Sequence, residues 1–87
     1  MADEAVIAIV GSYAGLLEAF VKQRHELGLS QLSVDGIGGV QSGYCAKLEC
    51  GTKRFGMMSL ECMLGALGLE LAVVRTVPHH SRQRRLA

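Results

Sequence analysis

The stretch that decides the fold spans residues 29–51 and reads LSQLSVDGIGGVQSGYCAKLECG. Ser30 is the predicted N-cap of a short helix over residues 31–37, because a serine hydroxyl can accept a hydrogen bond from the first turn. Gly39 follows at a position where a tight turn needs a positive φ. A second helix is predicted over residues 42–50. Two short helices joined by a glycine turn make a candidate helix-turn-helix unit.

One longer helix is predicted on each side of this unit. The first covers residues 13–27, with Ser12 as N-cap and Gly28 as the residue that ends it. The second begins after its N-cap Ser59, and its apolar residues recur at helical spacing: Leu60, Met63, Leu64 and Leu67. Residues 12–68 are therefore expected to form one helical domain.

The two ends of the chain differ from its middle. Residues 1–11 form an extension whose apolar run Val6–Val10 predicts either a short strand or an extra helical turn. Residues 69–78 contain a partly alternating, β-branched run that ends at Pro78, which predicts a strand. Residues 79–87 form a basic tail with almost no apolar side chain, and we expect that tail to be disordered.

Length and composition exclude several classes of protein. The chain has 87 residues, enough for one domain, and 49% of them are hydrophobic. A net charge of +1 excludes a histone-like polycation, and the absence of Trp disfavours a stacking platform for single-stranded nucleic acid. No apolar run approaches the roughly 18 residues of a membrane span. Acidic residues precede the first apolar run, the wrong charge order for a secretory signal, so a cytoplasmic, nucleoid-associated location is expected.

No set of residues in the sequence has the pattern of a catalytic or metal site. The three cysteines, Cys45, Cys50 and Cys62, are odd in number and form no C-x-x-C pair, which argues against a disulfide framework and against zinc. We expect three reduced thiols that act as small apolar fillers. Since no paired acid and base or activated nucleophile is evident, we expect neither an enzyme nor a cofactor or metal.

Three short motifs occur in a fixed order in this region. They are Leu29-Ser30-Gln31, Gly39-Val40 and Tyr44-x-x-Lys47-Leu48-Glu49-x-Gly51. In these motifs the chain resembles the lambda-repressor-like, Cro/Xre-type helix-turn-helix family of bacteria and phages, over about residues 20–69. The resemblance implies a mainly α domain of four to five helices. The segment at 67–71 is also similar to the short C-terminal β-strand of a small group of such proteins.

The resemblance implies a way of binding DNA. In this family the N-terminal half of the second helix of the unit enters the major groove, where Gln pairs with adenine and Lys reaches guanine. Base contacts are thus implied for the outward residues Gln41, Ser42, Gly43, Tyr44 and Lys47. Phosphate contacts are implied for Gln31, which opens the first helix, and for Thr52, Lys53 and Arg54, which follow the second.

The resemblance further implies an ion pair between Arg24 and Glu49, which would fix the second helix of the unit against the helix at 13–27. Two positions depart from the family pattern. Asp35 stands where a small alanine is usual, and a carboxylate there must be solvated or capped. Gln41 stands where a serine N-cap is usual, so Ser42 is the expected cap.

One unit of this size reads too few base pairs for specificity in a genome, so a two-fold dimer on an inverted repeat is expected. The strand at 69–78 has an unpaired edge that its two-fold mate would satisfy. The expected interface residues are Leu64, Leu67, Leu69, Leu71, Val73 and Val74. The predicted function is sequence-specific binding of double-stranded DNA by a homodimeric transcription regulator, a repressor of its own or a neighbouring operon.

Two alternatives stay open at the level of sequence. An antitoxin of a toxin–antitoxin pair would use the same fold and add a surface that masks the toxin. A protein-interaction module, such as an anti-activator that sequesters another regulator, would keep the fold and lose DNA binding. Both alternatives require a protein partner, and neither requires a membrane.

Overall fold

The structure is a computed structural model that describes residues 5–75. Four helices follow one another along the chain: α1 (Tyr13–Glu26), α2 (Gln31–Gly38), α3 (Tyr44–Cys50) and α4 (Met57–Ala66). The fold is therefore mainly α, as predicted. The predicted basic tail at 79–87 and the last part of the predicted strand, 76–78, lie outside the described residues.

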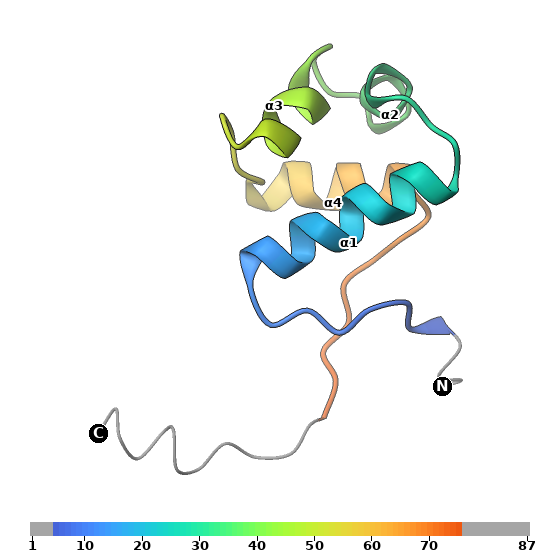
Figure 1. Ribbon diagram of the computed structural model, residues 1–87, viewed down its shortest axis with the longest axis vertical. Coiled ribbons are helices and arrows are strands. Elements are labelled where there is room, and N and C mark those ends of the chain that lie inside the picture. Colours follow the sequence, from blue (N-terminus) through green and yellow to red (C-terminus); the bar gives the residue numbers. More distant parts are fainter. Residues whose placement is uncertain (1–4, 76–87) are drawn as a thin grey trace.

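Figure 1 shows how the helices are arranged. α2 and α3 lie above the longer helices α1 and α4, and the segments before α1 and after α4 extend away below them. α2 packs closely on α4, where a Cβ built on Gly38 would lie 3.3 Å from the carbonyl oxygen of Cys62. The pair α2 and α3 thus lies at the opposite side of the helical body from the segments 6–11 and 69–75.

Local capping explains where the helices begin. The hydroxyl of Ser12 accepts a hydrogen bond from the Gly15 N–H, and the hydroxyl of Ser30 accepts one from the Ser33 N–H, both at 3.0 Å. These two serines are therefore the N-caps of α1 and α2, as the sequence predicted.

The starts of the other two helices were predicted wrongly. α3 begins at Tyr44 rather than Ser42, because Gly43 has a φ of +94° and cannot belong to a right-handed helix. α4 begins at Met57, before the expected cap Ser59. The Ser59 hydroxyl instead accepts a hydrogen bond from the Gly56 N–H at 2.9 Å, which holds the first turn of α4 from within.

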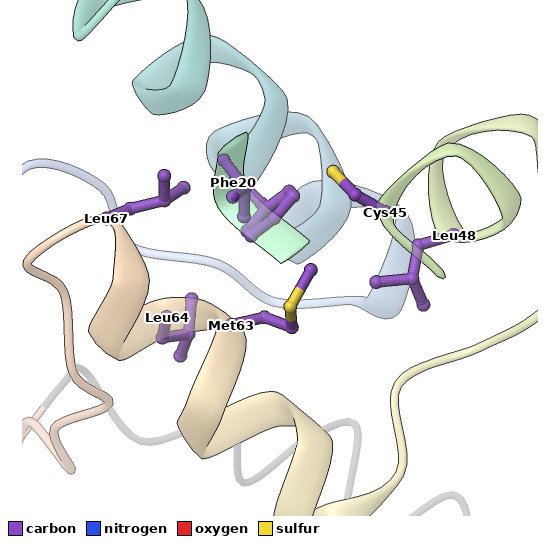
Figure 2. Close-up of a cluster of buried hydrophobic side chains, with 7 residues drawn as sticks. Phe20, Cys45, Leu48, Met63, Leu64 and Leu67 are labelled. Atoms are coloured by element: carbon purple, nitrogen blue, oxygen red, sulfur yellow. The ribbon is translucent and has the colours of Figure 1, made fainter. Parts of the chain in front are cut away.

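All four helices contribute to one core. Figure 2 shows Phe20 from α1 between the side chains of α3 and α4. The buried set is Phe20, Val34, Cys45, Leu48, Met63, Leu64 and Leu67. Cys45 and Leu48 of α3 are fully buried, and Val40 of the preceding turn packs against the core.

Two predicted dimer-interface residues belong to this core instead. Leu64 and Leu67 are 4% and 2% exposed, so their side chains are used within the chain itself. Leu69 is half-buried and also packs against the core. The apolar residues that stay exposed beyond α4 are Leu71, Val73 and Val74.

Residues 6–10, predicted as a strand or an extra helical turn, and residues 69–75, the described part of the predicted second strand, form no strand. Residues 6–11 and 69–75 are irregular, and no backbone-to-backbone hydrogen bond joins residues 6–11 or 70–75 to the rest of the described chain. A β-strand needs a neighbouring strand to accept and donate its hydrogen bonds, and this part of the chain provides none. No helix within residues 5–75 is long and apolar enough to cross a membrane.

Candidate nucleic-acid interface

The turn between α2 and α3 begins at a left-handed residue. Gly39 has a φ of +73°, which only glycine adopts without cost, and it caps the end of α2. The Val40 N–H then donates to the carbonyl oxygen of Asp35 at 3.0 Å, which closes the end of the helix. The predicted glycine turn is confirmed, and it sets the direction in which the chain enters α3.

Asp35 supplies the N-cap that α3 lacks in its own sequence. Its carboxylate accepts hydrogen bonds from the N–H groups of Gly43 and Cys45, both at 2.8 Å. The residue is only 1% exposed. Of the two environments expected for this carboxylate, solvated or capped, the structure has the second, because the first N–H groups of a helix stabilise a negative charge.

Ser42 does not cap α3. It is exposed, and its hydroxyl forms no hydrogen bond with any residue in the described range. The signal that could have identified Asp35 was present in the sequence: an aspartate next to a turn whose following helix has glycine at its N-cap position. The missing information was the distance between Asp35 and that helix, which only the packing of α2 against α3 sets.

The predicted ion pair between Arg24 and Glu49 is confirmed. Nε of Arg24 lies 2.7 Å from one carboxylate oxygen and Nη2 lies 2.9 Å from the other, a bidentate geometry. Nη1 also donates to the carbonyl oxygen of Leu29 at 2.9 Å. Because both side chains are about nine-tenths buried, at 10% and 12% exposure, this pair ties the end of α3 to α1 and to the loop before α2.

Gln31 belongs to the same network. Its Nε2 donates to Oε1 of Glu49 at 2.9 Å, so the side chain predicted to meet a phosphate is partly occupied in holding α3. Burial raises the pKa of Glu49, but the hydrogen bonds from Arg24, Gln31 and Cys45 outweigh burial and leave that pKa below its ordinary value. The carboxylate is therefore charged at neutral pH and keeps all of its donors.

The turn before α3 and the outer side of α3 present part of the predicted base-contacting set. Gln41, Ser42 and Lys47 are exposed. Tyr44 is turned towards α4 instead: its hydroxyl lies 2.6 Å from the Ser59 hydroxyl, and its ring packs against the core. Gly43 precedes α3 rather than lying within it. The turn and the outer side of α3 thus offer an amide, a hydroxyl and an ammonium group.

The loop that follows α3 carries the predicted phosphate contacts. Thr52, Lys53 and Arg54 are all exposed, and the Lys53 N–H donates to the carbonyl oxygen of Lys47 at 3.1 Å, which folds the loop back onto α3. The guanidinium of Arg54 lies over the ring of Tyr13 at 3.7 Å from the ring centroid. Lys47, Lys53 and Arg54 together place three cations on α3 and the loop after it.

The cysteines have different environments. Cys45 is fully buried, and burial, followed by its hydrogen bond to Glu49, raises the pKa of its thiol to about 12. Cys50 and Cys62 are exposed, so the prediction that all three fill the core is wrong for these two. The hydrogen bond between Cys50 and Thr52 lowers the pKa of the Cys50 thiol. Residues 5–75 contain no cluster of His, Cys, Asp and Glu that could hold a metal ion.

No family model, curated protein or solved structure matches the chain. The function must therefore be argued from the chemistry of these residues.

Proposed function

We propose that the chain is a regulator that binds double-stranded DNA sequence-specifically, with α3 in the major groove. One observation carries the proposal: the exposed residues Gln41, Ser42 and Lys47 lie at and just before α3, whose two ends are fixed by the Asp35 cap and the Arg24–Glu49 ion pair. A helix with side chains is about as wide as the major groove. A reading helix must also be held rigidly, because a small displacement removes its hydrogen bonds to base edges.

The roles of the exposed side chains follow from their chemistry. Gln41 can pair with the N6 and N7 atoms of adenine, and Lys47 can donate to O6 or N7 of guanine. Lys53 and Arg54 lie on the neighbouring loop and carry charge that suits backbone phosphates. In DNA recognition, phosphate contacts usually position the protein on the duplex, and contacts to base edges give sequence specificity.

We further propose that the regulator acts as a homodimer on an inverted repeat. The segment at 69–78 would pair with the same segment of a second copy, which would satisfy the backbone groups of residues 70–75 that have no backbone partner within the described chain. Leu71, Val73 and Val74 are exposed and would be covered by that pairing. A dimer bound at a promoter would repress by occluding it, with no catalysis.

Selection of bound sequences from a random pool of double-stranded DNA tests this function. We expect an inverted repeat with half-sites about 34 Å apart, one turn of the duplex. Failure of the pool to enrich, together with no complex at low salt in fluorescence anisotropy, would contradict the proposal.

Single substitutions then separate base reading from phosphate contact. Gln41→Ala and Lys47→Ala should reduce the preference for the selected site by about 1–3 kcal/mol each, the usual value of one good base contact. Lys53→Ala should weaken binding to all sequences alike and reduce the salt dependence. Lys22→Ala, which removes an exposed cation of α1, is the matched control and should change neither property.

A second function is favoured by one observation. Ile7, Ile9 and Val73 are 57%, 70% and 104% exposed, so these large aliphatic side chains are accessible to a protein partner. An antitoxin or an anti-activator would cover this surface with a protein partner. No shift of DNA by the purified protein, together with a stoichiometric complex with the product of an adjacent gene, would support this alternative over the first.

A further inference from the structure

Tyr13, the first residue of α1, makes three contacts with the loop between α3 and α4. The guanidinium carbon of Arg54 lies over its ring, 3.7 Å from the centroid. Its hydroxyl accepts a hydrogen bond from the Phe55 N–H at 3.1 Å. The ring also meets the edge of Phe55, with the two centroids 6.0 Å apart. Tyr13 therefore holds both the backbone of this loop and its arginine side chain.

The first consequence concerns the freedom of Arg54. This residue is exposed, and an exposed arginine normally samples many rotamers, which are lost when it binds a phosphate. An aromatic ring under the guanidinium restricts that sampling before any ligand arrives. No side-chain hydrogen bond of Arg54 is formed within residues 5–75, so its N–H groups stay available for a bidentate hydrogen bond to an anion.

The second consequence concerns the place of Arg54 relative to α3. The hydroxyl of Tyr44, the first residue of α3, lies 3.5 Å from the Arg54 carbonyl oxygen and 2.6 Å from the Ser59 hydroxyl. The loop is thus held at the start of α3 on one side and at the start of α1 on the other. No acidic side chain within residues 5–75 forms an ion pair with Arg54, so its charge is not neutralised there.

We propose that Tyr13 is a positioning residue for nucleic-acid binding: its ring holds the Arg54 guanidinium ready to clamp one backbone phosphate of the duplex that α3 reads. This inference rests on the proposed function and adds a residue that neither the motifs nor the charge pattern indicated. Arg54 makes the contact, and Tyr13 acts only through Arg54. Tyr13 therefore contributes affinity for every DNA sequence alike and no base preference.

The test is a double-mutant cycle on the selected DNA site, read by fluorescence anisotropy at several salt concentrations. Tyr13→Leu removes the ring, and we expect affinity to fall about two- to fivefold, the range of one exposed cation–π contact. The slope of log affinity against log salt should decrease in magnitude by up to about 0.9, the value of one lost phosphate contact. Arg54→Gln should produce the same change in slope, and Tyr13→Leu should then add nothing in the Arg54→Gln background.

Tyr13→Phe separates positioning from folding. It keeps the ring and removes the hydroxyl, so its salt slope should equal that of the unchanged chain even if its melting temperature falls. All anisotropy is measured well below the melting temperature of each variant, as followed by circular dichroism. If Tyr13→Leu keeps the full salt slope, or weakens binding as much in the Arg54→Gln background as in the unchanged chain, the positioning role is wrong while DNA binding stands. If the unchanged chain binds no DNA, both proposals fail.

Discussion

The surroundings of α3 and the two ends of the chain differ in whether their polar groups find hydrogen-bond partners within the chain. At the start of α3, backbone N–H groups donate to the carboxylate of Asp35. Near its end, the carboxylate of Glu49 accepts a hydrogen bond from Arg24. At residues 6–11 and 70–75, backbone groups and large aliphatic side chains have no such partners among the described residues. The helical body therefore completes its hydrogen bonds by itself, whereas the described parts of the two ends do not.

This difference shows which parts of the molecule are held in place by contacts within the chain. Under the proposed function, α3 would need such support before it meets DNA, because a displaced helix loses its hydrogen bonds to base edges. The proposed dimer segment would gain its contacts only when two copies associate. We therefore expect substitutions around α3 to cost the most folding free energy and substitutions in the two end segments to cost the least.

The largest loss is expected for Glu49→Ala. This change leaves the guanidinium of Arg24 buried without its carboxylate, and breaking such a pair from one side costs about 3–5 kcal/mol. Urea denaturation followed by circular dichroism measures the loss. Glu18→Ala, which removes an exposed carboxylate of α1, is the control and should change stability by less than about 0.5 kcal/mol.

The same pair predicts the pH dependence of stability. The pKa of Glu49 is lower in the folded chain than its ordinary value of 4.5, so the unfolded chain binds this proton first as the pH falls. The stabilisation is fully present above that ordinary value and is lost as the pH falls through the lower pKa of the folded state. Acid titration of the unchanged chain and of Glu49→Ala should give a smaller loss for the variant, and equal losses would contradict this role.

The next largest loss is expected for Asp35→Ala. The buried N–H of Cys45 and the partly buried N–H of Gly43 would lose their acceptor, at a cost of about 2–4 kcal/mol. Ser42→Ala removes the residue that the sequence alone indicates as the cap, and it should be almost neutral. Thermal unfolding of the two variants compares these caps directly, and a larger loss for Ser42→Ala would mean that the cap is Ser42.

A smaller effect is expected at the glycines of α2 and its cap, with opposite signs at two positions. Gly39→Ala forces a side chain into the left-handed region and should destabilise by about 1–2 kcal/mol. Gly36→Ala lies in open space within the helix and should stabilise by up to about 1 kcal/mol through helix propensity. Equal effects from both substitutions, measured by denaturation, would show that the turn does not depend on the backbone of Gly39.

The smallest effect on the helical body is expected from its ends. Leu71→Ser with Val73→Ser changes two exposed side chains, so the unfolding free energy of the monomer should change by less than about 0.5 kcal/mol. Sedimentation equilibrium should nevertheless show a dimer for the unchanged chain and a monomer for the double variant. A double variant that stays dimeric would place the interface elsewhere.

The sequence was most informative wherever an interaction is local. Ser12 and Ser30 each accept a hydrogen bond from an N–H group three residues later in the sequence. Gly39 is required at its position because the backbone there has a positive φ. The apolar stripe on α4 was also readable, because helical periodicity places Met63, Leu64 and Leu67 on one side. The Arg24–Glu49 pair was predicted from the resemblance of the motifs to a known family. Residue spacing alone does not predict a contact between residues so far apart in the sequence.

Local patterns by themselves determined that this chain forms short capped helices around a glycine turn, since each of those choices depends on a few consecutive residues. Only the tertiary structure decided how distant groups are used: that Asp35 caps α3, that Tyr44 faces α4, and that Leu64 and Leu67 lie in the core. It also left the two apolar ends unpaired, because a strand requires a neighbour and the described chain contains none. The physical reason is the same in each case, since a side chain or a backbone edge acquires its role from the group that packing brings within bonding distance.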